Sequence, residues 1–514
     1  MNYWALIIIF IFCSVYGYPQ SSIQSGYVYL DENRNGHFDQ GEKPLPGISI
    51  SNGCDIVQTN GQGEYKIPLL DDGVIFMIKP SNYIPALKDE NISNFFAFHR
   101  PEGSPGLKYE GLAKSRLPDQ VNFALYSNPG EEEFRVALLG DTQVEKIEHV
   151  SHVAKLVAEQ LINEQVDFVV PLGDLVFDDL DLFDPLKKVL GRIGSPVYYV
   201  YGNHDRNYDA AGLVYRDETY KANFGPSWYA FNYGEHAFLV LNNVFPENGT
   251  RKFEAKIDDL QLKFIANFIK TVPTTHSVHL LMHIPLEELA NRDALFQMLK
   301  GHAHVYAYAG HTHTQYFKNF KENEGWPNDK PLSELVAGAV CGAWWLGNKD
   351  IYGVPVSMMG DGTPKGYWIM DVDGSSRTLT YRVSGNSTND QMHIWTPPAS
   401  VDHQPSMGDN DILVNVFAGN ESTEVKIKIE DGDWILMEKV LEPDPFYVSQ
   451  IIAMEQQKNP DEKMPYYRDK FPVSQHLWKA RVPSDIGSGV YKIIVRASDD
   501  TGLNAKSQAL LFIK

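Results

Sequence analysis

Five short polar motifs in the middle of the chain carry side chains that could bind metal ions. Each motif follows an apolar run, and in chain order they are Gly140-Asp141-Thr142-Gln143, Gly173-Asp174, Gly202-Asn203-His204-Asp205, His283 and Gly310-His311-Thr312-His313. A Gly-Asp pair after a strand is a common turn, and a single histidine is usually an ordinary surface or core residue. The informative observation is therefore the whole set, because it collects the carboxylate, amide and imidazole groups that metal ions bind.

These groups are sufficient for two divalent or trivalent metal ions. Asp174 is the natural bridge between them because a carboxylate has two oxygens. Two ions about 3.5–4 Å apart can hold phosphoryl oxygens and stabilise both the attacking and the leaving oxygen of an in-line displacement. Glycine before several of the ligands lets the chain turn sharply close to the ions. Iron, manganese and zinc all accept such mixed nitrogen and oxygen ligands.

The residues around the motifs predict an α/β domain that brings them together. Apolar runs typical of buried strands, at 134–139, 167–172, 196–201 and 277–282, alternate with helical patterns such as that of 150–161. Strand–helix–strand alternation predicts crossover connections and an α/β core. In such folds ligands bind outside the carboxyl ends of the strands. We therefore expect the five motifs to meet at one edge of the core.

The order of the motifs resembles the calcineurin-like metallophosphoesterase superfamily, whose members carry GDxH, GDxxD, GNHD or GNHE, a lone His and GHxH. The resemblance covers roughly residues 134–383, half of the chain, and implies a four-layer α/β/β/α fold. It divides the ligands into Asp141, Gln143, Asp174 and His313 for a first metal ion and Asp174, Asn203, His283 and His311 for a second. It also implies that a metal-bridging hydroxide attacks phosphorus, that His204 protonates the leaving oxygen or holds the phosphate, and that Asp205 orients its imidazole.

Two positions depart from the pattern of the family. Gln143 stands where members more often have histidine, and an amide oxygen is a weaker and harder metal ligand. Phe177 stands where many members have aspartate and purple acid phosphatases have tyrosine, so we do not expect a purple phosphatase. Asp178, one position later, reads either as an outer contact of the site or as a helix N-cap.

Turn-rich aromatic segments after the last motif are candidates for shaping the substrate pocket, because loops on a rigid scaffold often carry specificity. Trp344 and Trp345 could stack on a base, a sugar or an aromatic leaving group, or they could pack at a domain interface. Arg206 and Lys349 are candidate phosphate contacts, with a solvated surface charge as the alternative for each.

The N-terminal region contains a different ion-binding pattern. Residues 31–42 fit the spacing D-x-[DN]-x-[DN]-G-x5-E of a calcium loop, with Asp31, Asn33, Asn35, the carbonyl of His37 and Glu42 as ligands. The flanking runs are strand-like, so the loop is not an EF-hand, and the region resembles the B-type β-sandwich repeats of surface adhesins. We therefore expect one structural Ca²⁺, and the alternative is an Asn/Asp/Gly-rich hairpin without an ion.

The 514 residues predict about three domains behind an N-terminal leader. We place the boundaries at 1–17 for a signal peptide, 18–126 for an N-terminal β-sandwich, 127–385 for the metallophosphoesterase domain and 386–514 for a C-terminal β-sandwich. The apolar run at 6–12 is typical of a secretory signal and too short to span a bilayer. We therefore expect a protein exported to the periplasm, the cell surface or the medium, with no membrane span after cleavage.

Composition excludes one class of partner. Lys and Arg number 45 against 66 Asp and Glu, the formal net charge is −21, and no basic run is present, which argues against a nucleic-acid polymer. A small phosphorylated substrate or a phosphoprotein remains compatible, because metal ions supply positive charge locally. Three cysteines do not form a disulfide framework. We therefore predict an exported metal-dependent phosphatase or phosphodiesterase of open oligomeric state; the alternative is a surface binding protein with an inert central domain.

Overall fold

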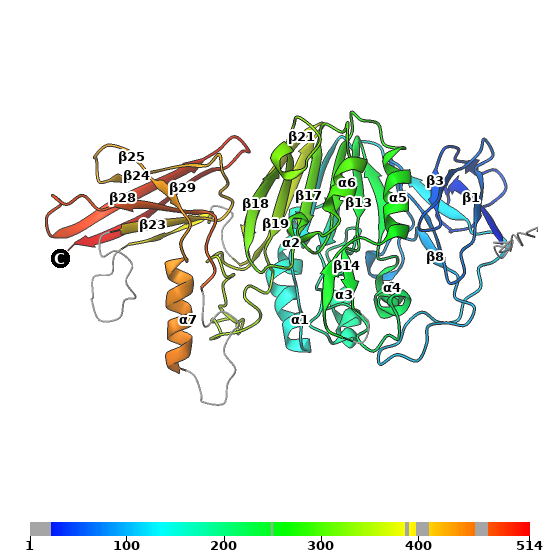
Figure 1. The fold of residues 1–514 in the computed structure, drawn as a ribbon, viewed down its shortest axis with the longest axis horizontal. Helices are drawn as coiled ribbons and strands as arrows, with labels where there is room; N and C mark the ends of the chain where they lie inside the picture. The colour runs from blue at the N-terminus through cyan, green and yellow to red at the C-terminus, as the bar shows by residue number, and fades with distance from the viewer. Residues whose placement is uncertain (1–21, 248–249, 386–389, 397–410, 458–470, 514) are drawn as a thin grey trace, which may run out of the picture.

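The computed structural model describes residues 22–247, 250–385, 390–396, 411–457 and 471–513. Along its longest axis the chain forms an N-terminal β-domain, a central α/β domain and a C-terminal β-sandwich (Figure 1). The predicted signal peptide at 1–17 lies outside the described residues. Within the described ranges, no helix has both the length and the apolar character needed to cross a bilayer.

The N-terminal domain is built from two small sheets. One contains β1 (Ile23–Leu30), β2 (Lys43–Pro44), β5 (Glu64–Pro68), β7 (Tyr83–Pro85) and β9 (Phe123–Ser127); the other contains β3 (Ser49–Ser51), β4 (Ile56–Gln58), β6 (Val74–Met77) and β8 (Phe96–Phe98). Alternate residues of the strands face inward, as in Tyr65 and Ile67 of β5, which are buried while Lys66 between them is exposed. The calcium-like loop connects β1 to β2.

The central domain contains two larger sheets. The first has the order β11-β10-β20-β21 and consists of β10 (Glu133–Leu139), β11 (Phe168–Pro171), β20 (Gly366–Asp373) and β21 (Ser376–Val383). The second has the order β12-β13-β16-β17-β19-β18 and consists of β12 (Tyr229–Tyr233), β13 (His236–Val240), β16 (Ser277–Leu281), β17 (Val305–Ala309), β18 (Gln315–Phe320) and β19 (Leu332–Ala337). A separate ribbon pairs β14 (Val244–Pro246) with β15 (Phe253–Ala255).

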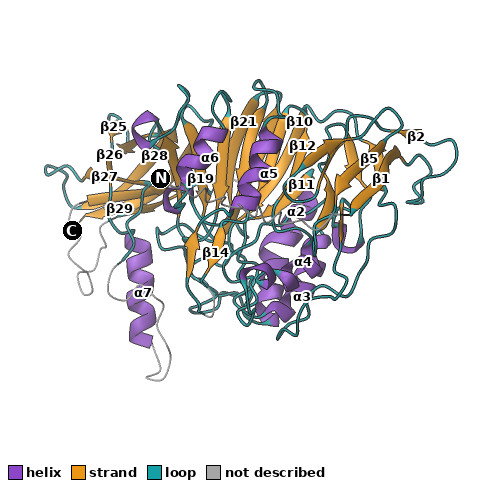
Figure 2. Ribbon diagram, turned by 45° about the vertical axis from the view of Figure 1, so that its right-hand side comes forward, coloured by secondary structure: helices purple, strands orange, loops and turns teal. Residues whose placement is uncertain are grey.

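Helices cover the outer faces of both sheets (Figure 2). On the side of the first sheet lie α1 (Ile147–Val153), a π-helical turn (Ala154–Ala158), α2 (Glu159–Glu164), α3 (Phe183–Gly191) and α4 (Glu218–Phe224). On the side of the second sheet lie α5 (Asp259–Ile269) and α6 (Arg292–Met298). Single 3₁₀ turns occur at Asp89–Asn91, Leu180–Leu182, Leu213–Tyr215, Leu286–Glu288 and Glu322–Glu324.

Strand β10 shows why the sequence forms four layers. From Val136 to Leu139 its residues are apolar and buried on both faces, as expected of a strand that is covered on both sides. Val136 and Leu138 belong to the core between the two sheets, whereas Ala137 and Leu139 belong to the core under the helices α1 to α4. The predicted α/β/β/α fold with flanking β-domains is therefore confirmed.

The carboxyl ends of the parallel strands converge on one edge of this core. Strand β10 runs parallel to β11, and β13, β16, β17 and β19 run parallel to one another. Four of the five motifs begin within two residues of the ends of β10, β11, β16 and β17. The two sheets therefore deliver their polar loops to a shared site.

The C-terminal domain has its own core and an additional helix. Its sheets contain β22 (Met392–Trp395), β23 (Asp411–Val416), β26 (Glu438–Val440) and β27 (Leu477–Arg481), and β24 (Glu424–Ile429), β25 (Ile435–Leu436), β28 (Gly489–Ser498) and β29 (Asn504–Ile513). Helix α7 (Pro445–Gln457) extends from the sandwich along the central domain (Figures 1 and 2). We expected only strands in this region, and α7 forms because Tyr447 and Ile451 pack against Ala343 of the central domain.

Candidate metal centre

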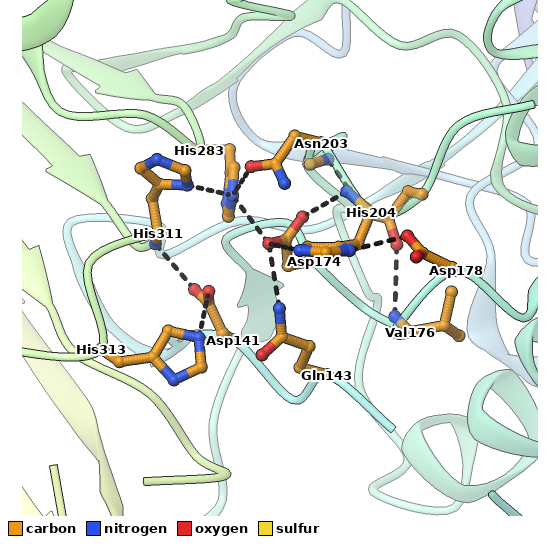
Figure 3. A network of polar contacts seen from close by, with 12 residues as sticks. Asp141, Gln143, Asp174, Val176, Asp178, Asn203, His204, His283, His311 and His313 are labelled. Carbon is orange, nitrogen blue, oxygen red and sulfur yellow. Dashed lines mark hydrogen bonds and ion pairs between the residues drawn. The ribbon is translucent and has the colours of Figure 1, made fainter. Parts of the chain in front are cut away.

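The structure brings all seven predicted metal ligands into one polar cluster (Figure 3). All of them except His311 are buried. They are Asp141, Gln143, Asp174, Asn203, His283, His311 and His313, and they come from loops of both sheets. Buried carboxylates beside buried imidazoles form a costly arrangement that a bound cation stabilises.

The backbone at the cluster is strained in a way that aims these side chains inward. Positive φ angles, which residues other than glycine rarely adopt, occur at Gln143 (37°), Asp174 (46°), His311 (73°) and His313 (52°). Two glycines are needed for steric reasons. A β-carbon at Gly202 would collide with the backbone of Asp174, and one at Gly310 would collide with the carboxylate of Asp141.

Four side chains fit the second metal ion. Nε2 of His283 lies 3.2 Å from Oδ2 of Asp174, 3.1 Å from Oδ1 of Asn203 and 3.2 Å from Nδ1 of His311. One ligand atom each from Asp174, His283 and His311 lie within 4.8 Å of one another. His283 donates its Nδ1 proton to the carbonyl of Leu172 at 2.9 Å, which leaves Nε2 as the nitrogen that can bind a metal ion.

Three further groups, together with Asp174, fit the first metal ion. Oδ2 of Asp141 is buried, lies 3.3 Å from Nε2 of His313 and receives no hydrogen bond within the described part of the chain. His313 donates its Nδ1 proton to the carbonyl of Gly342 at 2.7 Å, so its Nε2 faces the site. Gln143 presents its amide nitrogen to Asp174 at 3.3 Å, so ligation by the amide oxygen requires the amide group to turn over.

The charges in the cluster are strongly coupled. Burial opposes ionisation of Asp174, but His283 and His204 lower its pKa below the usual range. Burial alone would lower the pKa of His283, whereas Asp174 raises it to about 9. Burial and the neighbouring His283 lower the pKa of His311 to about 4. The site therefore holds an ionised carboxylate, and a cation that binds there displaces the proton of His283.

His204 lies beside this cluster with one nitrogen held and one nitrogen available. Its Nδ1 lies 2.7 Å from Oδ1 of Asp178, and its ring stacks on Phe177 with the centroids 4.6 Å apart. Its backbone N–H donates to Oδ1 of Asp174 at 2.8 Å, and Nε2 lies 4.0 Å from Oδ2 of the same carboxylate. The imidazole is therefore fixed with Nε2 directed towards the cluster.

Asp178, and not Asp205, orients this imidazole. Asp178 is not a helix N-cap, because the cap of the following 3₁₀ helix is Asp179. It is instead a residue that contacts the site from outside the predicted ligand set. The carboxylate of Asp205 instead accepts backbone N–H groups of Leu175 (2.9 Å), Val176 (3.2 Å) and Gly202 (2.9 Å). Burial raises the pKa of Asp205 to about 8. The predicted role of Asp205 was wrong, because its side chain turns back to join two loops.

The candidate cations are engaged elsewhere. The buried guanidinium of Arg206 donates to the carbonyls of Arg251 and Lys252 and lies over the ring of Tyr208, so it holds the β14–β15 turn and is not a phosphate contact. Lys349 is exposed and pairs with Glu148 at the start of α1, which agrees with a surface charge.

Arg251, which belongs to none of the sequence motifs, is a cation near His204. Its guanidinium pairs with Asp178 and lies 4.3 Å from the centroid of the Tyr208 ring. Its side chain is 67% exposed. Arg251 therefore connects the β14–β15 turn to the side chain that orients His204.

The two tryptophans have different surroundings. Trp345 is buried within the central domain, where its indole N–H donates to the carbonyl of Thr142 at 3.0 Å and its ring contacts His149 and His152 of α1. It can neither stack on a substrate nor pack at a domain interface. The partly exposed Trp344 lies with its ring centroid 4.8 Å from that of His313, one of the predicted ligands of the first metal ion.

The calcium-like loop folds around a side chain that its motif did not single out. Asp31 accepts the backbone N–H groups of Asn35 (3.2 Å) and Gly36 (2.8 Å). The amide nitrogens of Asn33 and Asn35 both donate to Oδ2 of Asp39, at 2.9 and 2.7 Å. The backbone N–H of Asp39 donates to Oε2 of Glu42 at 3.0 Å, and His37 is exposed. Three of the predicted ligands, Asn33, Asn35 and Glu42, thus contact Asp39.

Three models of one protein family match successive parts of the chain. Residues 32–109 match the N terminal of calcineurin-like phosphoesterase, residues 134–315 match calcineurin-like phosphoesterase itself, and residues 334–504 match the C terminal of calcineurin-like phosphoesterase. The first match lies in the N-terminal β-domain and the second in the central domain, whereas the third begins within β19 of the central domain and extends into the C-terminal sandwich. No curated protein matches the chain.

Two solved structures are similar over part of their length. A dimetal phosphatase from Danio rerio is 15% identical, with 49% of this chain and 96% of that chain covered and a TM-score of 0.34. A purple acid phosphatase from yellow lupin (Lupinus luteus) seeds is 14% identical, with 66% of this chain and 67% of that chain covered and a TM-score of 0.37. Neither likeness is close enough to bear on the substrate of this chain.

Proposed function

On the premise that this chain belongs to the calcineurin-like phosphoesterases, whose reaction is metal-dependent hydrolysis of phosphoesters, we propose that it is an exported phosphatase or phosphodiesterase in which His204 acts on the leaving oxygen. The convergence of the seven ligands beside His204 is the observation that carries this proposal. Two bound metal ions would supply an activated water and neutralise charge on the phosphoryl oxygens.

We assign the other steps of the proposed reaction to individual side chains of the protein. Asp174 accepts from both sides of the cluster and holds the two groups of ligands together. Asp178 retains the Nδ1 proton of His204, so Nε2 is the atom that delivers a proton to the leaving oxygen or holds the phosphate. Trp344 offers an aromatic face beside His313 for a base, a sugar or an aromatic leaving group. The substrate class is a small phosphorylated molecule or a phosphoprotein.

Export is proposed from the sequence of the leader. The apolar run at 6–12 and the small and polar residues that follow it support cleavage near residue 17. Cell fractionation of the full chain tests this directly. Recovery of the uncleaved chain in the cytoplasmic fraction would contradict it.

The N-terminal loop supports a second proposal, a structural Ca²⁺. Asp31 is buried, and Asn33, Asn35 and Glu42 surround Asp39 at the spacing of a calcium loop. Calcium at about 100 times its Kd would stabilise the protein by about 2.7 kcal/mol. Thermal unfolding with Ca²⁺ and with a chelator measures this effect, and an Asp31→Asn variant should lose it. An equal melting temperature in both conditions would favour an ion-free hairpin.

The decisive experiment is an activity assay on the mature chain. Metal is stripped and manganese, iron or zinc is added back singly, with an aryl phosphate monoester and an aryl phosphodiester as substrates. We expect turnover that depends on the added metal and is absent from the Asp174→Asn protein. No turnover with any metal on either ester would instead favour a surface binding protein with an inert central domain.

A further inference from the structure

A buried loop of the central domain is bonded to the backbone that carries His313. Oδ2 of Asp361 accepts the backbone N–H of Gln315 at 2.5 Å, and Oδ1 accepts that of Thr363 at 2.8 Å. The backbone N–H of Gly360 donates to the carbonyl of His313 at 3.1 Å. Asp361 and its neighbour therefore hold the chain at His313 and two residues beyond it.

The C-terminal sandwich in turn holds Asp361. The side-chain amide of Asn415, at the end of β23, donates to the backbone carbonyl of Asp361 at 2.8 Å and to Oδ2 of Asp444 at 2.9 Å. Its oxygen accepts from Nδ1 of His476 at 2.7 Å, and Nε2 of His476 lies 3.3 Å from Oδ2 of Asp361. The side chain of Gln315 reaches across in the opposite direction and donates to the carbonyl of Phe417 at 2.5 Å.

These contacts are buried, which makes them costly to break. Asn415 and Asp444 are 0% exposed, and Asp361, His476 and Gln315 are 1% exposed. A buried polar group that loses its partner costs about 1–3 kcal/mol. Each link between the sandwich and the loop of Asp361 therefore has a substantial structural effect on the loop.

Helix α7 supports the imidazole of His313 from another direction. Asp444 accepts the backbone N–H of Tyr447 at 2.9 Å and thereby fixes the start of α7. Tyr447 and Ile451 pack on Ala343. Ala343 directly follows Gly342, whose carbonyl accepts the Nδ1 proton of His313 at 2.7 Å. The backbone and the ring of His313 are thus both backed by elements of the C-terminal domain.

Two ligands of the proposed second metal ion are held from within the central domain. His283 bonds to Leu172 and Asn203, and the carbonyl of Asn203 accepts from Tyr208. Among the described residues, the contacts traced from the C-terminal sandwich therefore lead to His313 and not to these two ligands.

We propose that the C-terminal β-sandwich is a positioning element for the first metal ion, and that Asn415 acts through Asp361 to hold His313 in its ligating position. The proposal rests on the proposed function, which assigns His313 to that ion. Outer contacts that orient a metal ligand typically contribute 10–100-fold to metal affinity. Loss of the amide of Asn415 should therefore weaken the binding of one of the two metal ions and leave the binding of the other unchanged.

The test uses the full chain with Asn415→Ala and, as a matched control, Gln391→Ala. Gln391 also has a buried amide beside the domain junction, but it donates to the carbonyl of Tyr381 in β21, away from His313. Stripped protein is titrated with Mn²⁺, and free Mn²⁺ is followed by electron paramagnetic resonance. We expect two ions in the wild type and the control, and one ion bound about 10–100-fold more weakly in Asn415→Ala.

A second variant and a reference keep the result interpretable. If Asn415→Ala does not fold, Asp361→Asn replaces it in the test. This variant keeps the backbone carbonyl that Asn415 contacts, and it should weaken the binding of the same ion. His313→Ala should lose that ion outright, and adding Asn415→Ala to it should cause no further change in the remaining one. Two ions of wild-type affinity in Asn415→Ala and Asp361→Asn would overturn the proposal. Failure of the wild type to bind a pair of ions would overturn the proposed function as well.

Discussion

Replacing Asp178 by alanine should slow turnover by about 10–150-fold while both metal ions stay bound. The prediction tests whether the carboxylate that touches His204 in space is the one that matters for it. The side chains meet through a single hydrogen bond of 2.7 Å from Nδ1 of His204 to Oδ1 of Asp178. Neither residue belongs to the predicted metal ligands, so the effect should fall on the chemical step.

The magnitude follows from that hydrogen bond. Both side chains are 21% exposed, so the bond is only partly screened by solvent. A hydrogen bond to a charged group contributes about 1.5–3 kcal/mol. Each 1.36 kcal/mol lost from transition-state stabilisation slows a reaction about tenfold, which gives the range of about 10–150-fold. Asp178→Asn keeps an oxygen that can accept the Nδ1 proton, so its loss should be smaller.

The assay combines steady-state kinetics with metal analysis and thermal unfolding. We expect kcat to fall in Asp178→Ala, with the metal content and melting temperature close to those of the wild type. Asp205→Asn is the control, since its carboxylate accepts three backbone N–H groups and should chiefly affect stability. A wild-type kcat in Asp178→Ala, together with a large loss in Asp205→Asn at an unchanged melting temperature, would refute the assignment.

Three further predictions follow from the site and the core. Asp174→Asn should lose both metal ions, because its carboxylate contacts both groups of ligands; plasma mass spectrometry of dialysed protein measures this. His204→Ala should lose turnover far more than metal, because its ring lies outside the ligand set; kinetics and metal analysis on one sample compare the two losses. Glu334 has a pKa raised to about 8 by burial in the folded protein, from 4.5 when exposed, so the folded state holds the extra proton between these values. The free energy of unfolding should therefore fall as pH rises from about 4.5 to 8, by an amount on the order of 5 kcal/mol. Glu334→Gln, which keeps an acceptor for the N–H of Leu286, should flatten that slope in denaturant titrations.

Each of these has an outcome that contradicts it. Full metal occupancy in Asp174→Asn would exclude it as the bridge between the ions. Equal losses of metal and turnover in His204→Ala would argue that the imidazole supports the metal cluster and does not act on the substrate. An unchanged pH dependence in Glu334→Gln would show that another group titrates in that range.

The clustering of the candidate metal ligands could be predicted because their signal is local. Asp141, Asp174, His283 and His311 each follow a strand, and parallel strands present their carboxyl ends at the same edge of a core. Residue type and order along the chain then suffice to name candidate ligands, and the resemblance to the family divides them between two metal ions. The positive φ angles at several of them are consistent with positions that the surrounding fold holds under strain.

The residues that contact His204 could not be predicted from local sequence. Asp205 is adjacent to His204 in the sequence, yet its carboxylate points to the backbone of Leu175 and Val176. Asp178 lies 26 positions away and makes the contact. Arg206 and Trp345 are of types that commonly bind substrates, but both are engaged in the core. Side-chain direction depends on neighbours that are remote in sequence.

The sequence by itself predicted an α/β core, flanking β-domains and a set of candidate metal ligands, because strand periodicity and short motifs are encoded within a few residues, and the resemblance of the motifs to a known family added the four-layer arrangement. Only the tertiary structure decided which carboxylate orients His204, where helix α7 forms, and how Asn415 in one domain reaches the loop that carries His313 in another. These features depend on buried contacts between segments that are far apart along the chain, and such contacts exist only after the domains have packed.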